Sequence, residues 1–157
     1  MAATPRNPVS GGFATSPTLP TATSGLALYN STFDEYFVAQ DGVWRTLDAN
    51  AALIPAHVSV QMRDAVCLAG GVAMPLNVTS HDWCAGVVQA LHDSMALVRW
   101  EGDVHGFVGL DEDALYCGTS TPGQMSTTPD PAYNLIRVGR AVSADTLRVH
   151  LDQPILV

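Results

Sequence analysis

The spacing of turn-forming residues is the feature that most limits how this chain can fold. From Phe33 onward, short apolar runs are separated by Gly, Asp, Asn or Ser, and no segment carries the apolar repeat of an amphipathic helix. Strands that follow one another at intervals of about 8–12 residues are typical of all-β sandwiches and barrels. The sequence therefore predicts an all-β fold: a small antiparallel β-barrel or sandwich module with an extended N-terminal arm.

Several runs are expected to pair as hairpins because a turn lies between them. Asp41-Gly42 separates two β-prone runs, and an Asp-Gly dipeptide strongly favours a two-residue hairpin turn. The final hairpin is expected to place Leu147 and Val149 in the core. Further turns are predicted at 70–71, 92–94 and 143–145.

Three local patterns are less regular. The alternation of apolar and polar residues over 58–63 predicts a half-buried strand that slips in phase at Asp64. Residues 101–103 predict a turn ahead of a strand over 104–108. The segment 31–35 either forms a turn or caps one short helical turn.

The chain is expected to divide at about residue 30. Residues 1–28 contain four prolines and a Gly11-Gly12 pair, with Arg6 as the single charge, so residues 1–30 are predicted to form an extended arm that cannot fold alone. This arm is either a disordered tail or a segment that lies along a neighbouring subunit. Residues 31–157 are predicted to form one β domain, with a lead-in hairpin over 31–55 and the main module over 56–157.

The charge of the chain narrows the choice of partners. All seven basic residues are Arg, and fifteen acidic residues give a net charge of −8. Nucleic acid and anionic membranes require a cationic surface, so neither is expected as a partner. Only 14% of the residues are charged, against roughly 25% in an ordinary soluble domain. We therefore expect much of the surface to be buried in an assembly.

No apolar run approaches the ~20 residues of a membrane span, and no signal peptide precedes the arm. The chain is accordingly expected to be soluble and to be synthesised in the cytosol.

The sequence carries few signals of catalytic or metal chemistry. It has no Gly-x-Ser-x-Gly, P-loop, Gly-x-Gly-x-x-Gly or His-Glu-x-x-His motif. His81 and Cys84 would bind zinc only if the fold also brought Cys67 and Cys117 beside them. The three cysteines are otherwise expected to be small buried side chains. We predict no enzymatic activity, no catalytic residue, no cofactor and no metal.

Three of the seven basic residues, Arg137, Arg140 and Arg148, lie in the closing hairpin. In an acidic protein such a cluster can form bidentate hydrogen bonds with carboxylates of an adjacent subunit. The alternative is a solvated face of the final sheet. The three arginines are therefore candidates for contacts between subunits.

Four segments share their pattern with a known family. The run 66–73 contains a glycine turn between two apolar strands, and 85–88 with 96–104 form a central ladder. Residues 115–129 form a short strand followed by a loop of small residues, and 136–147 form the closing hairpin. In these segments the chain, from about residue 56 to residue 157, resembles the small capsid cement (decoration) proteins of tailed bacteriophages. A similar β-module occurs in phage head fibres and tail-associated proteins.

The resemblance implies a β-barrel-like module, usually a homotrimer, on the outer surface of the virion where major capsid proteins meet. The expected function is a structural one: the protein stabilises the capsid by bridging neighbouring major capsid proteins. Two alternatives remain open: a structural piece of a head fibre, tail fibre or adhesin, and a small trimeric all-β enzyme of the deoxyuridine-triphosphatase type. The chain lacks the uracil-binding stretch and the glycine-rich C-terminal arm of that enzyme family.

Overall fold

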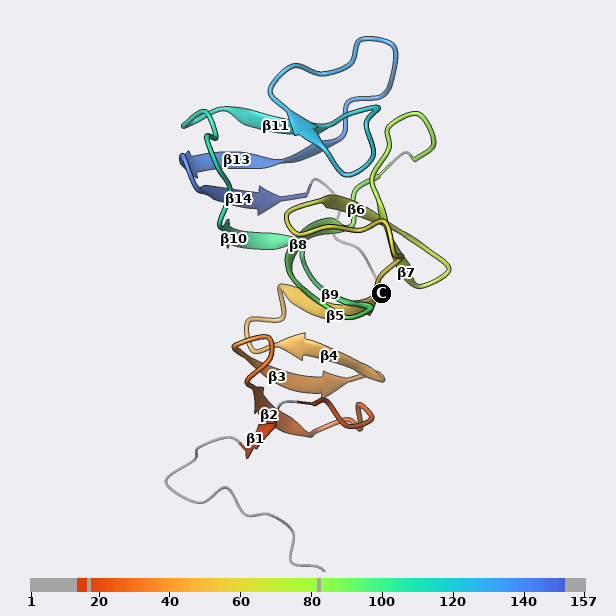
Figure 1. Cartoon of the computed structure of the whole chain (residues 1–157), viewed down its shortest axis with the longest axis vertical. Coiled ribbons are helices and arrows are strands. Elements are labelled where there is room, and N and C mark those ends of the chain that lie inside the picture. The colour runs from red at the N-terminus through yellow and green to blue at the C-terminus, as the bar shows by residue number, and fades with distance from the viewer. Residues whose placement is uncertain (1–13, 17, 82, 152–157) are drawn as a thin grey trace, which may run out of the picture. The chain divides into compact units, whose positions relative to one another are not determined.

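The computed structural model describes residues 14–16, 18–81 and 83–151, and these residues form strands and turns without a helix (Figure 1). The all-β prediction is confirmed. The chain separates into two compact units, residues 1–52 and residues 53–157. The predicted division at residue 30 falls inside the first unit, where Leu28 and Asn30 are buried in a strand. The predicted division between the lead-in hairpin (31–55) and the main module (56–157) lies near the boundary between the two units. The predicted arm lies outside the described residues over 1–13 and at position 17.

The first unit is a ladder of short strands in sequence order. β1 pairs with β2 in parallel, whereas β2, β3 and β4 pair antiparallel. Asp41 and Gly42 connect β3 and β4 with φ angles of 52° and 78°, the left-handed values of the predicted hairpin turn. The strands are β1 (Ala14–Ser16), β2 (Ala27–Asn30), β3 (Glu35–Gln40), β4 (Val43–Thr46) and the start of β5 (Ala51–Pro55).

The segment 31–34 between β2 and β3 is a turn, so the helical alternative for this segment is wrong. The side chain of Asn30 determines its shape: Oδ1 accepts hydrogen bonds from the backbone nitrogens of Thr32 at 3.0 Å and Phe33 at 2.9 Å. An Asn side chain that accepts from backbone two residues on is a common way of closing a turn. Asn30 is 1% exposed, and these bonds satisfy its buried oxygen.

The second unit contains two groups of antiparallel strands. In the first group the order is β9-β8-β6-β7, and the hairpin of β8 and β9 is strongly curved (Figure 1). In the second group the order is β10-β14-β13-β11-β12, with β14 and β13 in the interior. The strands are β6 (Ala65–Ala69), β7 (Val72–Pro75), β8 (Gly86–His92), β9 (Met95–Arg99), β10 (Glu101–His105), β11 (Leu115–Gly118), β12 (Met125–Ser126), β13 (Arg137–Ser143) and β14 (Thr146–His150).

The core of the second unit lies on one face of the five-stranded sheet. On β14, Leu147 and Val149 are fully buried while Arg148 between them is exposed, which is the period of two expected for a half-buried strand. Val104 on β10 and Val138 on β13 are fully buried in the same core cluster. The predicted inward direction of Leu147 and Val149 is confirmed.

Two predicted elements are wrong. Residues 58–63 form turns rather than a strand, and Val58 is 93% exposed. Of the three apolar residues that alternate there, Val58, Val60 and Met62, only Val60 is buried. Residues 101–103, predicted as a turn, instead open β10, since Glu101 and Asp103 pair with His150 and Arg148 of β14.

Truncating Leu147 tests the position of the core. Leu147→Ala removes a fully buried side chain, so we expect the free energy of unfolding to fall by about 2–5 kcal/mol. Leu135→Ala is the matched control, because Leu135 is 51% exposed and its truncation is expected to change the free energy by about 0.5 kcal/mol or less. Urea unfolding followed by circular dichroism measures both, and equal losses would contradict the strand phase.

Candidate functional site

The arginine face is formed by the outward side chains of Arg137, Arg140 and Arg148 on the five-stranded sheet. Arg140 and Arg148 are directly opposite each other in the register of β13 and β14. The pairing of β11 with β13 shifts by one residue between Tyr116 and Cys117. This bulge keeps Arg137 on the exposed side although Val138 and Gly139 are both buried. The fold therefore brings the three predicted arginines to one face.

Two of these arginines have partners within the chain. Nε of Arg148 donates to Oδ1 of Asp103 at 2.7 Å, and Nη2 donates to Oδ2 at 3.1 Å, which is a bidentate pair across β14 and β10. Nη1 of Arg140 donates to the backbone oxygen of Asp113 at 2.8 Å. Arg137 is exposed and has no hydrogen bond or ion pair with any residue that the structure describes. Of the three, Arg137 has the guanidinium most available to a second molecule.

The Arg148–Asp103 pair has an electrostatic consequence. The hydrogen bond from Arg148 lowers the pKa of the Asp103 carboxyl below its ordinary 3.8, and the positive charge of Arg148 acts in the same direction. A carboxyl with a lowered pKa in the folded state stabilises the fold above its unfolded pKa, and this stabilisation is lost as the pH falls through the folded value.

Replacing Asp103 tests this linkage. We expect Asp103→Asn to be less stable than the wild type at about pH 6, and the difference to narrow as the pH falls towards about 2 and the wild-type carboxyl takes up a proton. Chemical unfolding across this pH range gives the free energies, and Arg148→Met should show the same narrowing. A difference that is independent of pH would contradict an ionic pair.

The three cysteines do not form the zinc site that the sequence left open. Cys67, Cys84 and Cys117 are free and buried, and no group of three or more His, Cys, Asp or Glu suited to a metal occurs among the described residues. Sγ of Cys84 lies 3.5 Å from the backbone oxygen of Val66 and 3.4 Å from that of Gly86. Burial raises the pKa of the Cys84 thiol to about 12. A thiol in this environment is a poor nucleophile and a poor metal ligand at neutral pH.

Thiol reactivity tests the burial of the cysteines. In the folded chain at about pH 8, none of the three thiols is expected to react with Ellman's reagent, whereas all three react after unfolding in guanidinium. Val58→Cys supplies the positive control, because position 58 is 93% exposed. A native thiol that reacts as fast as the thiol introduced by this control substitution would show that the core is open.

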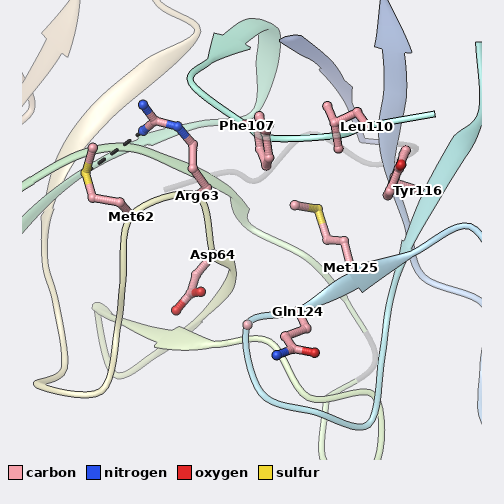
Figure 2. A pocket seen from close by; sticks show the side chains of 9 residues that line it. Met62, Arg63, Asp64, Phe107, Leu110, Tyr116, Gln124 and Met125 are labelled. Carbon is pink, nitrogen blue, oxygen red and sulfur yellow. Dashed lines mark hydrogen bonds between the residues drawn. The ribbon is translucent and has the colours of Figure 1, made fainter. Parts of the chain in front are cut away.

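A second candidate site is a pocket of about 260 Å³ within the second unit (Figure 2). Its walls come from three stretches far apart in the sequence: the turn before β6, the connection from β10 into β11, and the loop that leads into β12 with the first residue of that strand. Most of the wall is apolar, and two of its side chains are methionines, which adapt their shape to a ligand. The lining residues are Met62, Arg63, Asp64, Phe107, Leu110, Tyr116, Gly123, Gln124 and Met125.

Asp64 is the acidic group of the pocket wall. Its Oδ2 accepts a hydrogen bond from the backbone nitrogen of Gln61 at 2.8 Å, and Oδ1 accepts none from the described residues. The carboxyl packs directly on Gly123, where an added Cβ would lie 2.5 Å from Cγ of Asp64. Burial raises the pKa of Asp64, and the bond from Gln61 opposes this shift. The Asp64 carboxylate has thus lost part of its hydration, and no basic side chain among the described residues forms an ion pair with it.

Arg63 forms the opposite wall and is held against the backbone. Arg63 has a φ of 71°, a left-handed value that is uncommon outside glycine. The backbone at this residue is therefore not extended, and the side chains around it do not alternate as they do along a strand. In Figure 2, Arg63 and Asp64 leave the chain in opposite directions. Nη1 of Arg63 donates to the backbone oxygen of Gln89 at 2.6 Å and lies 3.9 Å from Sδ of Met62. Burial lowers the pKa of this guanidinium.

Sequence reasoning missed this pocket because it assigned residues 58–63 to a strand. The phase slip at Asp64 was the one local signal, and it marks the left-handed turn at Arg63. No local pattern relates Asp64 to Phe107 or Met125, because their proximity depends on how distant loops meet in the fold.

Comparison of the chain with protein-family models, with curated proteins and with solved structures finds no match. Within the residues that the structure describes, no helix combines the length and the apolar character needed to cross a membrane.

Proposed function

We propose that this protein is a structural virion protein of a tailed bacteriophage, which binds the outer capsid surface and bridges neighbouring major capsid proteins. The observation that carries the proposal is the exposure of apolar side chains at loop positions of the second unit. Val58 is 93% exposed and Val108 is 97% exposed. Neither side chain is used by the core of its own unit, so both are available to a partner.

The composition supports the same conclusion. Charged residues make up only 14% of the chain, so its surface loses little ionic hydration when a partner covers it. Burial of apolar surface contributes about 25 cal/mol per Å², and a standard interface of about 1,600 Å² supplies several kcal/mol after the costs of association. Contacts of this kind, repeated over a shell, add their strengths through multivalency. Stabilisation by contact requires no catalytic group.

The arginine face supports self-association into the proposed homotrimer. The exposed guanidinium of Arg137 fits a carboxylate of an adjacent copy, and a chain with a net charge of −8 offers many such carboxylates. Arg140 and Arg148 stay bound to Asp113 and Asp103 of their own chain and would border such a contact rather than form its centre.

Charged substitutions at the exposed valines test the proposal. With empty capsids of the phage whose genome encodes the chain, we expect Val58→Asp/Val108→Asp to lower the affinity about tenfold or more, since a buried uncompensated charge is costly at an interface. Ser59→Asp is the control, because it adds a charge beside Val58 without removing an apolar side chain. Cosedimentation measures binding, and circular dichroism verifies that each variant is folded.

Two further observations would decide between this proposal and its alternatives. Antibody labelling of virions is expected to show signal spread over the head, whereas signal at the tail or at one vertex would favour a fibre or tail protein. Sedimentation equilibrium is expected to give a trimer. A monomer that does not bind capsids would overturn the proposal.

A further inference from the structure

The size of the Asp64 pocket restricts what it can hold. Pockets for drug-sized ligands have volumes of roughly 300–1,000 Å³, whereas a cavity of about 150 Å³ already holds benzene. At about 260 Å³, this pocket matches a single long side chain better than a whole metabolite. The pocket is accessible to a partner, because Met62 in its wall is 48% exposed.

The chemistry of the wall restricts the occupant further. Met62, Phe107 and Met125 supply polarizable and aromatic surface, and Asp64 supplies a carboxylate oxygen, Oδ1, with no donor among the described residues. Lysine and arginine side chains combine an apolar stem with a cationic head, and they bury the stem along apolar surface. A cation also gains from the face of an aromatic ring. The wall therefore complements a basic side chain along its whole length.

The neighbouring guanidinium does not reverse this complementarity. Arg63 already donates to the backbone oxygen of Gln89, and its Nε is enclosed without a partner among the described residues. A ligand carboxylate would have to reach a guanidinium that is packed against Gly106, whereas Asp64 keeps one carboxylate oxygen without a donor among the described residues. The net charge of −8 on the whole chain also attracts cations over longer distances.

From these observations we infer that the pocket binds a lysine or arginine side chain of a partner protein, with the stem against Met62, Phe107 and Met125 and the cationic head at Asp64. The inference rests on the proposed function only in that the partner is taken to be a protein. A second copy of this chain is a poor source, because the chain contains no lysine and its exposed Arg137 is assigned to the contact between copies. The partner is therefore a different chain with a basic residue at its contact surface.

Small-molecule probes with the same stem test the inference. The protein is labelled with ¹³C at its methionine methyl groups and titrated separately with n-butylguanidinium, n-butanol and butyrate. Met62 and Met125 line the pocket and report binding, while Met74 and Met95 do not line it and serve as internal references. We expect n-butylguanidinium to shift Met62 and Met125 with an affinity about fivefold or more above that of n-butanol, and butyrate to bind most weakly.

An isosteric variant isolates the charge. Asp64→Asn keeps an acceptor for the Gln61 nitrogen, and we expect it to weaken n-butylguanidinium about fivefold while leaving n-butanol unchanged. Asp93→Asn is the matched control: Asp93 has a φ of 51°, which Asn tolerates, and it lies outside the pocket wall. This control is expected to bind both probes like the wild type.

Several outcomes would overturn the inference. Equal affinities for n-butylguanidinium and n-butanol would mean that Asp64 does not recognise a cation, and tighter binding of butyrate would assign the pocket to an acidic group through Arg63. Shifts at Met74 or Met95 without shifts at Met62 would place binding elsewhere. These results are distinct from failure of the proposed function: a wild-type chain that never binds capsids contradicts that function even if the pocket binds the cation.

Discussion

The alternation of side chains along β14 is the constraint on which the second unit depends. Leu147 and Val149 project into the core and Arg148 projects outward. A shift of one residue in the strand register would therefore bury Arg148 and expose Leu147 and Val149. Pairing with β10 on one side and β13 on the other holds this register. The direction in which alternate side chains of β14 point therefore determines both the core and the arginine face.

The same constraint explains why the outer face is ionic in a protein that has few charges. A strand with one buried face needs polar residues at alternate positions, and β10 and β14 provide Asp103 and Arg148 opposite each other. Cross-strand pairs of opposite charge stabilise a sheet modestly, whereas the like charges of Arg140 and Arg148 oppose each other across β13 and β14. The carboxylate of Asp103 offsets that repulsion by binding Arg148.

Local signals predicted the parts of the fold that depend on adjacent residues. Asp41-Gly42 predicted its hairpin because the dipeptide itself favours left-handed φ angles. The inward direction of Leu147 and Val149 followed from the period of two. Residues 58–63 misled the same reasoning, because Val58 alternates with polar neighbours yet lies 93% exposed in a turn. The three arginines were predicted as a cluster, but the partners of Arg148 and Arg140 were not, since Asp103 and Asp113 are distant in sequence. The pocket depends on three stretches that are far apart in the sequence, and the phase slip at Asp64 was its one local signal.

The exposed valines and the Asp64 pocket would contribute differently to binding under the proposed function. Apolar contact is strong but non-directional, so Val58 and Val108 would add affinity without determining the orientation of the protein on its partner. A carboxylate at the wall of a pocket accepts a cation only from a limited direction, and a partner that leaves it unpaired loses free energy. On a capsid lattice, where every copy would take the same orientation, the proposed function would require both contributions. A variant that loses only Asp64 would then be expected to bind capsids with reduced order, whereas one that loses both valines would bind them more weakly.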